Sequence, residues 1–184
     1  MLGWKDFALL QDSVLGIWDV AEVNLACAAG LPGSEHIDLA FCRQELDNQA
    51  KDVREDLALA EACFRHHPHH WDNSWARCRT HLLVRVLLRH GVRYNPAKMD
   101  EDAPSTPDGS FIHGVLQGEG GTCASIPVVV AAVGRRLGFP IKLVKAKCHL
   151  FARWEGEGER FNIAVNNTGF DTPWPAPRNL VHAL

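Results

Sequence analysis

A cysteine, a histidine and an asparagine follow one another in the second half of the chain and could together perform thiol chemistry. Cys123 comes directly after the glycine-rich run GEGGT, His149 lies in KCHLF, and Asn162 lies in RFNIAV. A thiol attacks a carbonyl carbon as the thiolate, and a neighbouring imidazole can take its proton. An asparagine oxygen can hold that imidazole in position. The three residues therefore predict a nucleophile, a base and an orienting group.

The same reaction needs hydrogen-bond donors for the oxyanion that forms on the attacked carbonyl. The backbone N–H of Cys123 is one candidate, since we expect this residue to open a helix. Gln117, in the loop ahead of the cysteine, is the candidate for a second donor through its side-chain amide, with His113 a weaker alternative. This chemistry requires no metal and no cofactor.

The elements that must position these residues follow from periodicity and from glycine and proline. The glycines ahead of Cys123 permit close backbone approach, and Thr122 can cap a helix. An apolar helix is expected over 123–137 and ends at Gly138. The run IKLVKAKCHLFARWE favours one or two strands, GEGE a turn, and RFNIAV the paired strand of a hairpin. Because the helix must pack on that hairpin, we expect His149 to approach it.

Helical periodicity dominates the first half of the chain, in segments 4–28, 38–65 and 74–90. The candidate caps are Ser34 or Asp38 for the second segment and Asp72 or Asn73 for the third.

The polar run RYNPAKMDEDAPSTPDGS separates these helices from the cysteine-bearing part. We therefore expect a helical N-terminal region over 1–95 and a catalytic core over 96–184, packed as one unit. Helices followed by antiparallel strands indicate an α+β fold, with the cysteine helix packed on the sheet. The run TPWPAPRNL predicts an extended tail.

Composition narrows the possible functions. The chain has 184 residues and a formal net charge of −3, without a block of like charge, which argues against a nucleic-acid partner. No window is apolar enough for a membrane span, and the start lacks a signal-peptide pattern, so we expect a cytoplasmic protein without membrane contact. The 6 cysteines form no CxxC pair and are expected to be mostly buried and reduced. The run HHPHH lacks a completing ligand at zinc spacing and predicts no metal site.

The stretch GEGGTCASIPVVVAAVGRRLGFPIKLVKAKCHLFARWEGEGERFNI resembles the transglutaminase-like superfamily in its bacterial branch. The upstream runs NLACAAGLPG and GVRYNP also resemble the helical region of that branch. The resemblance implies a papain-like fold and a Cys-His-Asp/Asn triad, with Cys123 and His149 carried over directly. Many relatives have an acid two residues beyond Asn162, where this chain has Ala164. Whether Asn162 replaces that acid is left open by the sequence.

Two functions remain, and a metal-binding protein through HHPHH is a third and weaker alternative. The first is a thiol enzyme that hydrolyses, or transfers the acyl group of, amide bonds in peptides or proteins through an acyl-Cys123 intermediate. The second, motivated by Ala164, is a catalytically weak or inactive binding module on the same fold. Substrate and oligomeric state cannot be predicted from these residues.

Overall fold

The computed structural model describes residues 18–99, 106–147, 149–166 and 169–171. The start of the first expected helix and the proline-rich tail lie outside these residues, as does Cys148. The helices and strands are α3 (Val20–Ala28), α4 (Leu39–His66), η1 (Pro68–Trp71), α5 (Trp75–Arg89), η2 (Pro96–Met99), α6 (Pro107–Ser110), α7 (Ile112–Leu116), α8 (Ile126–Arg136), β1 (Ile141–Ala146), β2 (His149–Gly156), β3 (Glu159–Asn166) and β4 (Gly169–Asp171).

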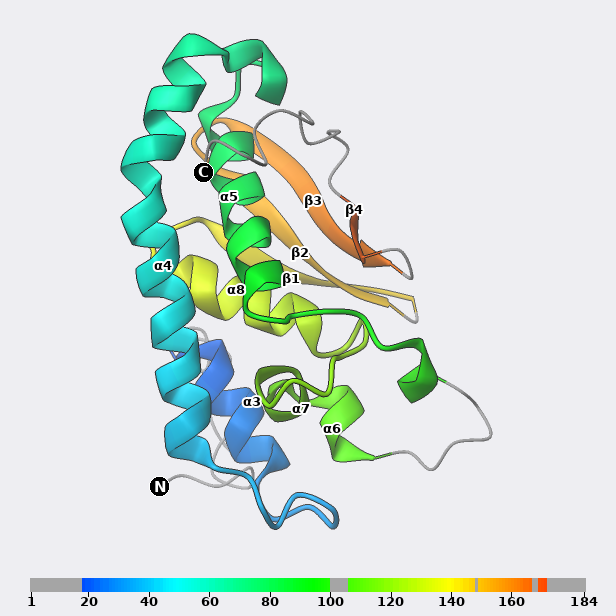
Figure 1. Ribbon diagram of the computed structural model, residues 1–184. Coiled ribbons are helices and arrows are strands. Elements are labelled where there is room, and N and C mark those ends of the chain that lie inside the picture. The colour runs from blue at the N-terminus through cyan, green and yellow to red at the C-terminus, as the bar shows by residue number, and fades with distance from the viewer. Residues whose placement is uncertain (1–17, 100–105, 148, 167–168, 172–184) are drawn as a thin grey trace.

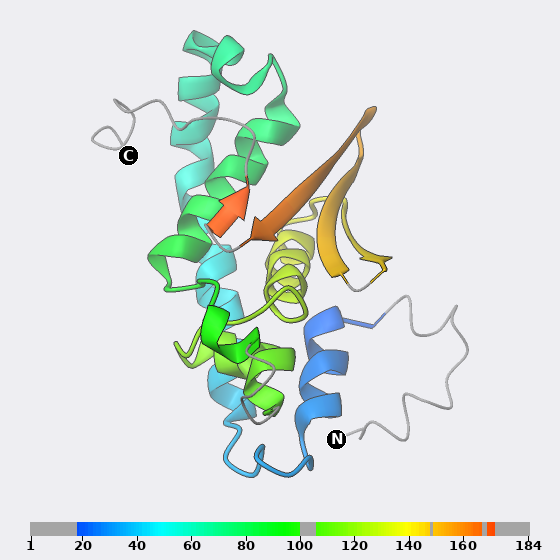
Figure 2. The same ribbon diagram turned by 90° about the vertical axis from the view of Figure 1, so that its right-hand side faces the viewer.

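The four strands form one antiparallel sheet in the order β1-β2-β3-β4 (Figure 1). Helix α8 lies between this sheet and the pair α4 and α5, as the turned view shows (Figure 2). The predicted α+β class is confirmed, with helices first and a small antiparallel sheet after them. The short strand β4 was not predicted, because the turn residues after β3 resemble the start of the tail.

Helix α8 is the centre of the hydrophobic core. Its residues from Ile126 to Gly134 are all buried, which explains why its sequence is apolar on every side. At Gly134 an added Cβ would lie 2.5 Å from Cδ1 of Ile141, so the glycine lets β1 approach the helix closely. The buried side chains of β2 on the same side are Ala152 and Trp154. This packing determines which face of the β1–β2 hairpin points toward α8.

The helix boundaries mostly agree with the predicted caps. Asp38 caps α4 by accepting a 2.9 Å hydrogen bond from the N–H of Phe41. The prediction for α5 was wrong, because Ser74 is its cap and neither Asp72 nor Asn73 fills that role. Both of these residues have positive φ, of 54° and 58°, because the chain turns back after η1 before the helix starts.

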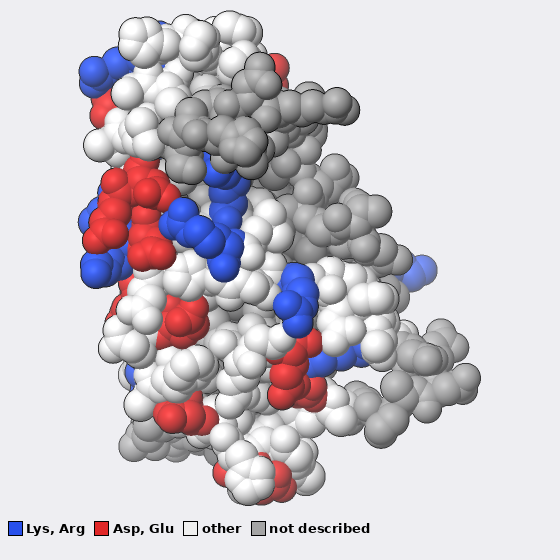
Figure 3. All heavy atoms as spheres, in the orientation of Figure 1, with Lys and Arg blue, Asp and Glu red and all other residues white. Residues whose placement is uncertain are grey.

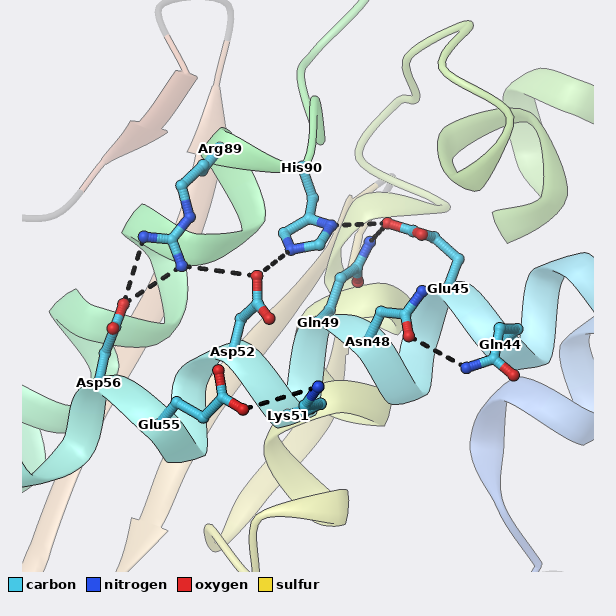
Figure 4. Close-up of polar contacts among 10 residues, drawn as sticks. All are labelled: Gln44, Glu45, Asn48, Gln49, Lys51, Asp52, Glu55, Asp56, Arg89 and His90. Atoms are coloured by element: carbon cyan, nitrogen blue, oxygen red, sulfur yellow. Dashed lines mark hydrogen bonds and ion pairs between the residues drawn. The ribbon is translucent and has the colours of Figure 1, made fainter.

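A polar network joins α4 to the end of α5 (Figure 4). The two ring nitrogens of His90 face carboxylates of α4, with Nδ1 2.7 Å from Oε1 of Glu45 and Nε2 2.9 Å from Oδ2 of Asp52. Arg89 donates to Asp56 at 3.2 Å. The acidic residues of α4 therefore bind α4 to the end of α5, in addition to forming its solvent-facing surface.

Charges of both signs lie side by side on the face drawn in Figure 3, where acidic side chains gather along α4 among Lys and Arg. Within the described ranges, no helix combines the length and the apolar character needed to cross a bilayer.

Candidate active site

The glycine-rich loop ahead of Cys123 is held by the segment that follows α5. The N–H of Gly121 donates to the carbonyl of Arg93 at 2.9 Å, and the N–H of Asn95 donates to the carbonyl of Gly121 at 2.8 Å. Gly120 has a φ of +77°, and a Cβ added to it would lie only 3.0 Å from the Cβ of Asn95. Positive φ and this close approach together require glycine here. The hydrogen bonds to Arg93 and Asn95 thus hold the glycine-rich loop in place just ahead of Cys123.

Cys123 lies in a turn that is stabilised by the hydroxyl groups of Thr122 and Ser125. Thr122 Oγ1 accepts from the N–H of Ala124 at 3.1 Å, and Ser125 Oγ accepts from the N–H of Thr122 at 3.0 Å. Both hydroxyls also donate to the carbonyl of Gly109, at 2.9 and 3.0 Å. Both side chains thus bind neighbouring backbone N–H groups, but the residue that precedes α8 as its N-cap is Ser125 and not the predicted Thr122.

The regular helix begins later than predicted, at Ile126 instead of at Cys123. The N–H of Ile126 donates to the carbonyl of Thr122 at 3.1 Å, which is already a helical bond. Pro127 has no N–H, so the next bond, to the carbonyl of Cys123, cannot form. Cys123 therefore occupies an isolated first turn and not a continuous helix.

Cys123 and His149 line one open groove of about 330 Å³. The remaining residues that line it come from the same turn and from the two ends of the β1–β2 hairpin: Ala124, Lys145, Ala146 and Leu150. Cys123 is half-buried there, and its backbone N–H has no hydrogen-bond partner among the described residues. An attacked carbonyl oxygen could accept from this N–H.

His149 is exposed at the first position of β2. Side chains alternate along a strand, so His149 lies on the opposite face from Ala152 and Trp154, which pack toward α8. Its ring stacks on that of Phe151, with centroids 6.0 Å apart and planes at 24°. Within the described chain no hydrogen bond joins the His149 ring to the Cys123 thiol. The two residues share the groove without forming a bonded pair.

Asn162 does not reach His149 in this arrangement. It is directly opposite Arg153 in the β2–β3 ladder, and its Oδ1 accepts a 2.9 Å hydrogen bond from Nε of Arg153. Arg153 is four positions along β2 from His149, which corresponds to roughly 13 Å of strand. The asparagine oxygen is thus engaged elsewhere on the outer face of the sheet.

The candidate oxyanion donors in α7 also lie apart from the groove lining. Gln117 is exposed at the C-terminal end of α7. His113 is 3% exposed, and burial lowers the pKa of its imidazole. Of the candidate donors, the Cys123 N–H is the one that belongs to a residue lining the groove.

Comparison with known proteins supplies the family. A family model described as the transglutaminase-like superfamily matches residues 40–170. The chain belongs to this superfamily. No curated protein and no solved structure matches it. The match begins in α4 and ends in β4, so it includes both the helical part and the groove.

Burial raises the pKa of three other thiols of this transglutaminase-like chain. Five cysteines are described, and all of them are free. Burial raises the pKa of Cys42 to about 11 and that of Cys78 to about 12. Burial also raises the pKa of Cys27. These thiols are therefore poor nucleophiles at neutral pH.

The histidines of HHPHH form the end of α4 and the turn η1, where their rings contact one another. The rings of His69 and His70 are 4.4 Å apart. No group of three or more His, Cys, Asp or Glu side chains is placed to hold a metal ion in the part of the chain that the structure describes.

Two residues of the site were not singled out from the sequence. Ser125 directly precedes an apolar helical run, and a serine in that position is a cap signal that could have been recognised. Lys145 lines the groove, but nothing local distinguishes it from a lysine on any exposed strand.

Proposed function

We propose that this transglutaminase-like chain is a thiol enzyme that opens amide bonds in peptides or proteins. The observation that supports the proposal is the groove that Cys123 and His149 both line, where the backbone N–H of Cys123 has no hydrogen-bond partner among the described residues. A nucleophile, a base and an oxyanion donor are the minimum set for acyl transfer through cysteine.

The reaction proceeds in two steps. The Cys123 thiolate forms a bond to the amide carbon, His149 gives the proton it took from the thiol to the leaving nitrogen, and the carbon–nitrogen bond breaks. Water or an amine then attacks the acyl group, His149 removes its proton, and the carbon–sulfur bond breaks. Water gives hydrolysis and an amine gives acyl transfer.

His149 must turn from Phe151 toward Cys123 for these steps. It is exposed, and exposed side chains change rotamer within nanoseconds. The motion is therefore much faster than a typical turnover of milliseconds to seconds.

The test is the pH dependence of iodoacetamide alkylation at each cysteine, mapped by mass spectrometry. We expect Cys123 to react well below pH 8 and ahead of the other thiols, and His149→Ala to abolish this advantage. His36→Ala, at an exposed histidine far along the sequence, is the matched control. A Cys123 that reacts like a free thiol in both the wild type and His149→Ala would contradict the proposal.

The acceptor is tested separately with glutamine-containing peptides and a fluorescent primary amine. Fluorescence that becomes attached to the peptide indicates acyl transfer. Ammonia release without attachment indicates hydrolysis.

A catalytically weak binding module is the second candidate. It is favoured by the hydrogen bond from Arg153 to Asn162, which leaves His149 without the expected orienting amide. The alkylation test separates the two functions, because a binding module needs no enhanced Cys123 reactivity.

A further inference from the structure

The groove beside Cys123 contains a cation that thiol chemistry does not require. Of the six described residues that line it, Lys145 carries a full positive charge, and none is an Asp or Glu. The side chains of Ala124, Ala146 and Leu150 are apolar. A substrate that enters the groove therefore meets Lys145 beside Cys123 and His149, among apolar side chains.

Lys145 reaches this position because of the alternation along β1. Ile141, Leu143 and Lys145 share one face of the strand, and Ile141 packs on α8 at Gly134. Farther along β1 the same face passes beyond the core to the start of α8, where Cys123 lies. Leu150 is the direct cross-strand partner of Lys145 and lines the same part of the groove.

The ammonium group of Lys145 is not neutralised by the protein. Lys145 is exposed, and within the described ranges it forms no ion pair, whereas Lys98 is bound to both Asp108 and Glu119. An unpaired cation in a groove attracts anions from solution, more strongly at low ionic strength.

We propose that Lys145 forms an anion subsite in the Cys123 groove, which selects substrates that carry a carboxylate close to the amide that is attacked. The inference rests on the proposed function for the position of the attacked bond. It adds the class of substrate: peptides with an acidic side chain or a free C-terminus next to the reacting amide.

Two alkylating agents that differ in one group test the subsite. Iodoacetate and iodoacetamide have almost the same size, but iodoacetate carries the carboxylate. The ratio of their rates at Cys123 is measured at low salt in the wild type, Lys145→Gln, Lys145→Arg and Lys142→Gln. Lys142 is an exposed lysine on the same strand that does not line the groove, so it is the matched control.

We expect Lys145→Gln to lower the iodoacetate-to-iodoacetamide ratio at Cys123 about threefold, the size of a charge interaction across several ångströms of water. Lys145→Arg and Lys142→Gln should retain the wild-type ratio, and 0.5 M salt should reduce it toward that of Lys145→Gln. An unchanged ratio in Lys145→Gln overturns the proposal. This includes the case in which both rates fall together, which would mean that Lys145 acts on the thiolate.

The failure of this proposal can be told from a failure of the proposed function. The ratio is also measured in His149→Ala at pH 9, which lies above the ordinary pKa of a free cysteine, about 8.5. If Cys123 has no special reactivity but its ratio still depends on Lys145, the anion subsite exists in a binding module. If Cys123 is reactive and its ratio ignores Lys145, the enzyme lacks this specificity.

Discussion

The Nε–H of Arg153 donates a 2.9 Å hydrogen bond to Oδ1 of Asn162, its direct partner across the β2–β3 ladder. The Arg153 guanidinium carbon also lies 5.3 Å from the centroid of the Phe151 ring, and this ring stacks on His149. The four side chains form a row along the outer face of the sheet. Within the described residues, Asn162 is linked to His149 through Arg153 and Phe151.

Replacing Asn162 should consequently leave the groove unchanged. We expect Asn162→Ala to keep the Cys123 alkylation rate within about twofold of the wild type. Because the hydrogen bond is exposed, the free energy of unfolding should fall by less than about 1 kcal/mol. Alkylation kinetics and urea denaturation measure the two quantities. A tenfold loss of reactivity, matching that of His149→Ala, would instead mean that Asn162 orients the imidazole during the reaction.

The hydroxyl of Thr122 should stabilise the folded protein and hold the turn that contains Cys123 in position. Thr122→Val keeps the shape but leaves the carbonyl of Gly109 with one donor fewer and the N–H of Ala124 without an acceptor. A buried polar group that loses its partner costs about 1 to 3 kcal/mol. We expect a loss of that size in urea denaturation for Thr122→Val. Thr122→Ser retains the hydroxyl and should stay close to the wild type, so equal losses in the two variants would contradict this explanation.

Gly121 should tolerate no side chain. A Cβ at this position would lie 2.5 Å from both Ser125 Oγ and Val115 Cγ2, so the hydroxyl that supports the cysteine turn must move. We expect Gly121→Ala to lower the free energy of unfolding by about 1 to 3 kcal/mol, as overpacked cores do, and to change Cys123 alkylation.

Gly118 provides the control for that variant. It has φ of +87° and no atom within 4 Å of an added Cβ. Gly118→Ala should thus cost about 1 kcal/mol of backbone strain and leave the alkylation rate unchanged. An effect of Gly118→Ala on Cys123 as large as that of Gly121→Ala would show that loop strain, and not the contact with Ser125, controls the turn.

His81 should make stability depend on pH. Burial lowers its pKa to about 4, and its Nδ1 accepts a 3.3 Å hydrogen bond from Nε1 of Trp71, which requires the neutral ring. In the unfolded chain the ring titrates near its ordinary value of about 6.5. As the pH falls from about 6.5 to about 4, the unfolded state binds a proton that the folded state does not. Stability should therefore fall across this window, by up to about 3 kcal/mol, and this contribution should level off below it.

The comparison of wild type with His81→Asn isolates this contribution. An asparagine oxygen can accept from Trp71 near the position of Nδ1 but does not titrate. Urea denaturation at pH 7 and pH 5 should show a smaller loss of stability in His81→Asn than in the wild type. Equal losses in the two proteins would assign the pH dependence to other groups.

Much of the fold could be predicted because its signals are local. Asp38 caps α4 as expected, and the hairpin strands β2 and β3 lie where alternating residues and the GEGE turn indicated. The error at Ser74 and the late start of α8 also have local causes. Asp72 ends the η1 turn and so cannot cap α5. Pro127 lacks the N–H that would otherwise bond in the first turn of α8.

The sequence by itself determined the order of the long helices and of the hairpin strands, the cap of α4 at Asp38, and the loop and hairpin that carry Cys123 and His149. These depend on residues a few positions apart, whose dihedral preferences and hydrogen bonds act within one turn or one hairpin. Only the tertiary structure decided that Asn162 binds Arg153 and that Lys145 faces the groove. Those contacts depend on strand register and on how far α8 extends under the sheet, which are set by packing between segments distant in the chain.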